Sequence, residues 1–203
     1  MIYKDNGNLL ELQKEARSIA DEVQELFGAL TKEQLNWRPN PKSWSIAQCL
    51  DHLIAANRNY FPIFEEIILG ERKKRILERF PFLAHLWAWL LINSFRPGSK
   101  RKLKAPKIFM PSASDFDCNV IPQFSDNQGR LIGFMQATAF LDLRHTLITS
   151  PATRFVTYSL CGAYEIILQH ERRHMAQARR VMGAKNFPNG TVKSNVRQKQ
   201  PQL

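Results

Sequence analysis

A stripe of inward-facing positions, spaced alternately by four and three residues, runs through residues 153–182. Its members are Val156, Leu160, Ala163, Ile167, His170, His174, Gln177 and Val181. This heptad pattern predicts a long helix that packs against other helices. Two histidines and a glutamine stand among its inward positions, and buried polar groups cost free energy unless they are paired or bind something. The stripe therefore predicts packed helices with a polar site between them.

Three further helices are predicted by the same kind of pattern. They cover residues 9–30, about 45–69 and about 125–139. The second has a defined start, because Ser45 followed by Gln48 fits a capping box. No run of residues reads as a convincing strand, and the segment 141–151 is predicted to be a loop. The sequence thus favours an all-α protein, an antiparallel four-helix bundle of the type that builds metal sites between facing helices.

Residues 71–104 interrupt this pattern and are predicted to form an insertion between the second and third helices. Basic stretches flank the apolar run FPFLAHLWAWLLINSF, and residues 71–107 hold eleven Lys/Arg against two Glu, a net charge of +9. Two short helices, or one helix broken at Pro81, fit this insertion. The bundle with its insertion is assigned to residues 1–185, and 186–203 to a basic, disordered tail.

The composition also bears on the compartment. The three cysteines are widely spaced and odd in number, so no disulfide framework is implied and a reducing compartment is the default. The N-terminus lacks the apolar core of a signal peptide, and the apolar run of the insertion is shorter than a membrane span requires. We expect a soluble, cytoplasmic protein that could also be peripheral to a membrane.

The string His-Glu-Arg-Arg-His at 170–174 is the strongest chemical motif. A spacing of four puts His170 and His174 on one helix face, one turn apart, where both can hold the same metal ion. The string also fits the signature of zinc proteases, in which Glu171 would be the general base. The protease family takes its third ligand from downstream, but residues 175–203 contain no Asp, Glu, His or Cys. Glu171 is therefore expected to pair with a nearby arginine.

A third ligand must come from upstream, and His52 is the candidate. It lies midway along the second helix, on a small, polar stripe that also includes Cys49 and Asn59. Three neutral imidazoles with an open coordination position form a catalytic type of site. Cys49 is either a fourth, sulfur ligand or a small buried helix residue, and the latter is preferred. Asn59 and Gln177 are candidates for a supporting or substrate-orienting role.

Two motifs carry a resemblance to a known family. WSIAQCLDHL at 44–53, preceded by LNWRP, resembles the second-helix signature of the DinB-like (YfiT-like) superfamily, and HERRHMAQ at 170–177 resembles its last-helix signature. The prolines of KAPKIFMPS are similar to the family's connector. The resemblance covers most of residues 9–182 apart from about 71–100. It implies a four-helix bundle, often a homodimer, with a divalent ion, commonly nickel or zinc, held by His52, His170 and His174.

The same resemblance implies a range of activities. Relatives of known activity are metal-dependent transferases and isomerases that use low-molecular-weight thiols, and others are classed as hydrolases. A three-histidine ion can activate either nucleophile, because it lowers the pKa of bound water or holds a thiol as thiolate. We therefore expect a metal-dependent hydrolase or thiol transferase acting on a small molecule. No residue of the motifs identifies a general base.

The basic, apolar insertion leaves a non-catalytic alternative open. Residues 76–96 combine aromatic and aliphatic side chains with flanking cations, which suits an anionic membrane surface, a dimer interface or additional core. On this reading the chain is a metal-binding or membrane-peripheral interaction protein. Net charge of +11 would also suit nucleic acid, but there is no recognition-helix pattern or aromatic-stacking motif, which argues against that partner.

Overall fold

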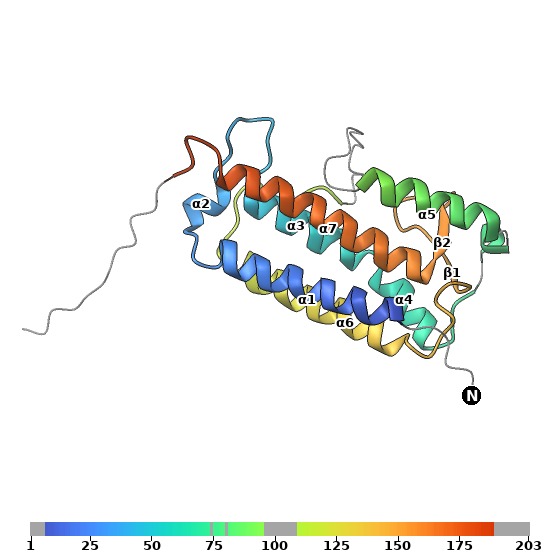
Figure 1. The fold of residues 1–203 in the computed structure, drawn as a ribbon. Helices are drawn as coiled ribbons and strands as arrows, with labels where there is room; N and C mark the ends of the chain where they lie inside the picture. The colour runs from blue at the N-terminus through green and yellow to red at the C-terminus, as the bar shows by residue number, and fades with distance from the viewer. Residues whose placement is uncertain (1–6, 74, 80, 96–108, 189–203) are drawn as a thin grey trace, which may run out of the picture.

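The computed structural model describes residues 7–73, 75–79, 81–95 and 109–188, and most of these are helical (Figure 1). The elements in chain order are α1 (Gly7–Phe27), α2 (Lys32–Asn36), α3 (Ile46–Arg58), α4 (Phe61–Ile68), the 3₁₀ helix η1 (Ile76–Arg79), α5 (Pro81–Phe95), α6 (Val120–Ala137), β1 (Leu147–Thr149), β2 (Thr157–Ser159) and α7 (Leu160–Met182). The expected all-α class holds apart from one small sheet.

Helices α1, α3, α6 and α7 enclose the core. Helices α1 and α3 each pack against both α6 and α7 (Figure 1). Their apolar stripes meet in one cluster of buried side chains, which includes Phe27, Leu50, Phe124, Leu131 and Tyr164. Removing these side chains from water is the main favourable contribution to such packing. The core thereby fixes α3 beside α7, the two helices that carry the predicted metal ligands.

The predicted start of the second helix is confirmed, whereas its predicted length is wrong. The Ser45 hydroxyl accepts a hydrogen bond from the Gln48 amide at 3.1 Å, and the Gln48 side chain accepts one from the Ser45 amide at 3.0 Å. Helix α3 then ends at Arg58 and α4 follows as a separate helix. Pro62 stands in the first turn of α4, and its missing N–H cannot continue the ladder of α3.

The loop predicted at 141–151 contains strand β1, and the last helix starts later than the expected residue 153. Strands β1 and β2 pair antiparallel, with Ile148 opposite Tyr158. Helix α7 follows β2 directly, and the Ser159 hydroxyl caps it by accepting from the Gly162 amide at 3.0 Å. The sequence pattern missed the hairpin because each strand has only three residues.

Helix α6 begins before the expected residue 125. It starts at Val120 and includes Pro122, which a first helical turn tolerates because amides at that position lack an intrahelical partner. The extra turn buries Val120 and Ile121 in the core. A short helix, α2, also forms in the segment between α1 and α3. It has a capping box of its own between Thr31 and Gln34.

The described part of the insertion contains two helical pieces, η1 and α5, and polar contacts tie it to the rest of the fold. The buried Glu78 carboxylate pairs with the Arg72 guanidinium and accepts a hydrogen bond from the Thr149 hydroxyl at 2.7 Å. Helix α5 packs along α7 and β2, and Arg173 of α7 donates to the Ser94 carbonyl at 2.9 Å. The insertion therefore lies against the helix that carries two of the histidines.

The predicted tail lies largely outside the described residues, which end at 188. Within them, the Phe187 ring packs edge-on against Trp37 at 5.6 Å, and the side-chain amide of Gln34 donates to the Pro188 carbonyl at 2.9 Å. Among the described residues, no helix is both long and apolar enough to cross a membrane.

Candidate metal centre

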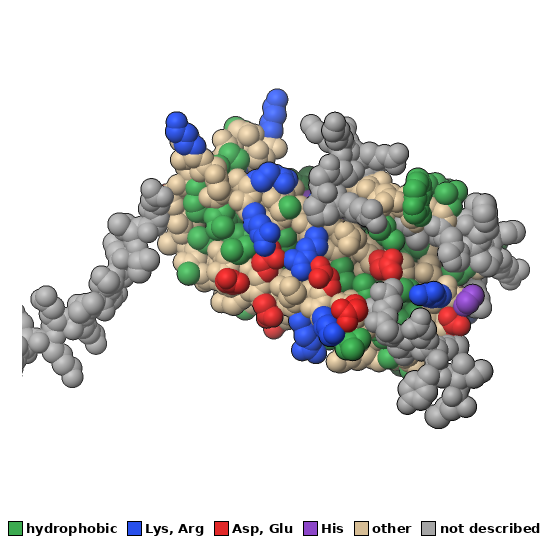
Figure 2. All heavy atoms as spheres, viewed as in Figure 1, with side chains coloured by type: hydrophobic (Ala, Val, Ile, Leu, Met, Phe, Trp, Pro, Cys, Tyr) green, Lys and Arg blue, Asp and Glu red, His purple; other side chains and the backbone are tan. Residues whose placement is uncertain are grey.

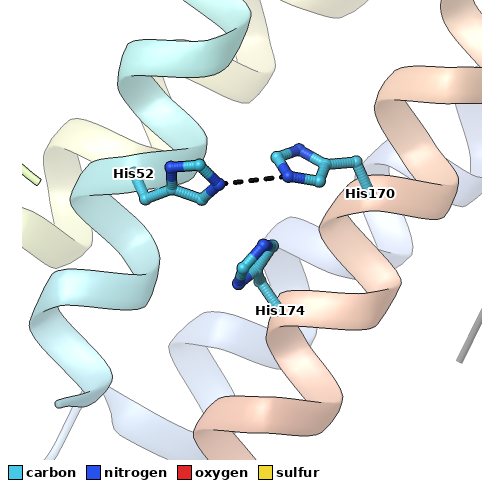
Figure 3. A group of neighbouring side chains, drawn as sticks. All are labelled: His52, His170 and His174. Atoms are coloured by element: carbon cyan, nitrogen blue, oxygen red, sulfur yellow. Dashed lines mark hydrogen bonds between the residues drawn. The ribbon is translucent and has the colours of Figure 1, made fainter. Parts of the chain in front are cut away.

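The three histidines singled out from the sequence converge on one point between α3 and α7 (Figure 3). His52 comes from the middle of α3 and is 1% exposed. His170 and His174 come from consecutive turns of α7 and are partly buried. One ring nitrogen from each lies within 4.8 Å of the other two. Each pair of rings is also in contact, with centroids 4.5 to 4.9 Å apart.

The shortest distance between ring nitrogens of two of these histidines is close to that expected for two ligands of one metal ion. The Nε2 atoms of His52 and His170 are 3.1 Å apart. Two nitrogens bound to one zinc ion at 2.0–2.1 Å and a tetrahedral angle would be separated by about 3.3 Å. The side chains thus already have nearly the spacing that a shared ion requires, and rotation of the third ring would complete the set.

The hydrogen bond of His52 fixes which of its nitrogens faces the site. Its Nδ1 lies within short hydrogen-bonding distance of the Phe109 carbonyl oxygen. A carbonyl can only accept, so Nδ1 carries the proton and the neutral ring presents a lone pair at Nε2. Such a contact orients a ligand histidine and raises its basicity. His52 is therefore prepared to bind a cation through Nε2.

Burial keeps the other two rings neutral as well. Burial, together with the neighbouring His52 and Arg173, lowers the pKa of His174 to about 3. The pKa of His170 falls well below its usual range, first through burial and then through His174 and His52. Only neutral imidazoles bind metal ions, so these shifts favour ligation at neutral pH over competition by protons.

Trp44 is part of the site, and the sequence pattern did not single it out for that role. Its ring stacks on His174, with centroids 5.6 Å apart and planes at 21°, and it lies 4.9 Å from the His52 ring. Trp44 directly precedes the capping residue of α3, a place typical of a hydrophobic staple. An aromatic wall here holds two of the rings in place and limits the access of water to them.

The other predicted site residues take different positions. Gln177 lies close enough to the His174 ring to oppose part of the lowering of its pKa. No hydrogen bond of good geometry reaches the buried Nδ1 of His174 among the described residues. Asn59 caps α3 and donates to the Ala55 carbonyl at 2.8 Å. Cys49 is fully buried, burial raises its pKa to about 12, and it is not a member of the histidine group. It therefore packs as a small apolar residue.

Glu171 does not form the expected ion pair with any arginine in the described part of the chain. The side chain is fully buried between α3, α6 and α7, where its carboxylate accepts a hydrogen bond from Asn57 at 2.7 Å. Asn57 also donates to Asn127 at 2.9 Å. Arg172, the neighbour in sequence, turns outward to Glu15 and Glu22 of α1. The Glu171 position on the helix explains this, since it points about 100° away from His170.

The donor set fits a divalent transition metal. Three neutral imidazole nitrogens suit zinc and nickel, whereas magnesium and calcium prefer oxygen ligands. The buried Nδ1 of His174, which lacks a hydrogen-bond partner among the described residues, is also a nitrogen that a ligand or water would satisfy. Three protein ligands leave further coordination positions open, as in catalytic rather than structural zinc sites.

Comparison with known proteins supports the motif resemblance. A model of the DinB superfamily matches residues 16–178, a range that includes all three histidines and extends across the insertion. Searches of curated proteins and of solved structures found no match to the chain.

Proposed function

The chain belongs to the DinB superfamily, and from this membership and the convergence of three neutral histidines we propose that it is a metal-dependent enzyme. In this proposal His52, His170 and His174 hold one divalent ion, zinc or nickel. The observation that carries it is the approach of the three ring nitrogens to within 4.8 Å of one another. The fold is the family's antiparallel four-helix bundle, formed by α1, α3, α6 and α7, and the protein acts as a cytoplasmic homodimer.

The bound ion would supply a nucleophile at neutral pH, either a water of lowered pKa or a thiolate. The residues of the chain position the ligand side chains and exclude water from them. The Phe109 carbonyl holds the Nδ1 proton of His52, and Trp44 covers the rings of His52 and His174. Gln177 stands one turn beyond His174 and is the candidate for orienting a small substrate, such as a low-molecular-weight thiol. The reaction is a hydrolysis or a thiol transfer.

A screen for activity tests this proposal. Protein loaded with zinc or nickel should catalyse thiol transfer from a panel of low-molecular-weight thiols, or hydrolysis of small esters and amides. Chelator treatment should abolish the activity and re-addition of the ion should restore it. His174→Ala should reduce kcat/KM by at least about a hundredfold, because it removes a ligand from the ion that creates the nucleophile.

His145→Ala is the matched control for that variant. His145 is exposed, lies near Asp142 and is not a member of the three-histidine group. Its replacement should therefore leave kcat/KM unchanged. Equal activity of the His174 variant and the unmodified protein, or activity that survives complete removal of metal, would contradict an enzyme of this kind.

A second candidate function is favoured by the outer side of α5. Leu86 and Trp89, three residues apart on one helix face, are 45% and 62% exposed, and Figure 2 shows hydrophobic side chains gathered where α5 reaches the surface. Lys73 and Arg75 precede the helix. Apolar and aromatic side chains beside cations suit an anionic membrane surface. In this alternative the chain is a metal-binding interaction protein that rests on a membrane through residues 76–96.

A further inference from the structure

The segment 109–113, which precedes α6, is held by side chains from one face of α3. Gln48 donates to the Ala113 carbonyl at 3.5 Å, Asp51 accepts from Ser112, and His52 donates to the Phe109 carbonyl. Positions 48, 51 and 52 lie on one face of a helix because they are three and four residues apart. We call residues 109–113 the connector. It runs antiparallel to α3, and its backbone is attached at three points.

Asp51 makes the strongest of these contacts with the connector. One carboxylate oxygen accepts from the Ser112 amide at 2.6 Å and the other accepts from the Ser112 hydroxyl at 3.2 Å. A hydrogen bond to an ionised acceptor is about twice as strong as a neutral one. Asp51 thus holds the backbone three residues after Phe109, the residue whose carbonyl oxygen fixes the His52 ring.

Phe109 is also anchored by its own buried side chain, which is 9% exposed, whereas the next two residues are held less firmly. Pro111 has no amide to donate, and Met110 is about half exposed. The Phe109 carbonyl must nevertheless lie at one place, because the orientation of an imidazole follows from the acceptor that its second nitrogen meets. Without the Ser112 anchor, the carbonyl could move away and His52 could rotate or change tautomer.

We propose that Asp51 is a positioning residue of the metal centre, which holds the connector so that the Phe109 carbonyl keeps His52 Nε2 directed at the site. The inference rests on the proposed metal centre but concerns a different residue. Asp51 does not touch the ion. It acts on the ligand His52 through Ser112 and Phe109, which lie outside the ligand set.

The test measures metal affinity and the tautomer of His52 in the full chain. Asp51→Ala should weaken binding of zinc or nickel by about tenfold, a loss typical of partners outside the ligand shell. In the metal-free protein, nitrogen NMR should show His52 shifting from the Nδ1-protonated form to a mixture of tautomers. Asp51→Asn keeps an acceptor for the Ser112 amide but loses the charge. Its affinity for the metal should therefore fall between that of the unmodified protein and that of Asp51→Ala.

The matched control is Asp115→Ala. Asp115 also lies close to the connector in sequence and makes an exposed ion pair with Lys32 at 2.8 Å, but it has no link to His52. Its loss should leave both metal affinity and the tautomer unchanged. If Asp51→Ala lowers thermal stability while the metal dissociation constant and the His52 tautomer stay as in the unmodified protein, Asp51 is only structural and the proposal is overturned.

Two results separate this inference from the proposed function. If the unmodified protein binds neither zinc nor nickel, the metal centre fails, and the tautomer of His52 still decides the role of Asp51. If Asp51→Ala does not fold, Asp51→Asn decides: weakening by threefold or more supports the proposal, and an unchanged dissociation constant overturns it.

Discussion

Glu171 directly follows His170 in the sequence, yet its side chain is buried among the helices and is not part of the three-histidine group. It is enclosed by α3, α6 and α7, where burial raises the pKa of its carboxyl group to about 7, while the hydrogen bond from Asn57 opposes that rise. A carboxyl group whose pKa is raised on folding stabilises the protein below its unfolded pKa of about 4.3. That contribution is lost as the pH rises through 7, because the folded state then holds a buried charge.

Glu171→Gln should therefore stabilise the protein in alkaline solution. At pH 8 the glutamine carries no charge, and the free energy of unfolding should rise by up to about 4 kcal/mol, the equivalent of the pKa difference. At pH 5 the folded carboxyl group is neutral but the unfolded one is largely ionised, so the difference should fall to about 1 kcal/mol. Denaturant unfolding of metal-free protein at the two pH values measures this.

Glu66→Gln is the control for this prediction, since Glu66 is exposed on α4 and its replacement should change the free energy of unfolding little at either pH. A Glu171→Gln variant that is less stable than the unmodified protein at pH 8 would show that the carboxylate is needed in its ionised form.

Helix α5 differs from the other long helices because its sequence is apolar on every side. One side is covered by α7 and β2, whereas Leu86 and Trp89 remain exposed. A helix that is apolar all round normally lies within a larger core or in lipid. The exposed side of α5 is thus the element on which the membrane alternative depends.

If α5 rests on anionic lipid, the protein should sediment with vesicles that contain phosphatidylserine and much less with neutral vesicles. The double variant Leu86→Ala, Trp89→Ala should bind about a hundredfold more weakly, because each of the two large apolar side chains contributes about 1.5 kcal/mol on burial. Added salt should also weaken binding.

Phe140→Ala is the matched control, since Phe140 is an exposed aromatic residue between α6 and β1. Its loss should leave vesicle binding unchanged. Equal sedimentation of the double variant and the unmodified protein would remove α5 as a membrane contact.

In the molecule as a whole, local periodicity predicted the long helices and the face on which the histidines stand. The stripe that contains His170 and His174 is regular over several turns, and the Ser45–Gln48 capping box is a short-range signal. Both depend on residues close in sequence, and such patterns are legible without a structure. The separation of α3 from α4 was also accessible, because Pro62 marks it.

What periodicity could not predict is the support around the site. The Phe109 carbonyl meets His52 across 57 residues, and Ser112 meets Asp51 across 61. Every residue has a backbone carbonyl, so the sequence does not indicate which carbonyl will meet a histidine. The irregular connector also has no hydrophobic periodicity from which its position could be predicted. The role of Trp44 was missed for a related reason, since its place before α3 also fits an ordinary staple. Such contacts are set by how the segments pack.

The metal stoichiometry of the full chain tests the central claim most directly. The protein prepared without chelators and titrated with zinc or nickel should bind one ion per chain. His52→Ala, His170→Ala and His174→Ala should each weaken binding by more than about a hundredfold, which exceeds the loss expected for an outer partner, and His145→Ala should bind like the unmodified protein. Failure of the unmodified protein to bind a stoichiometric ion, or full affinity in any of the three ligand variants, would contradict the three-histidine centre.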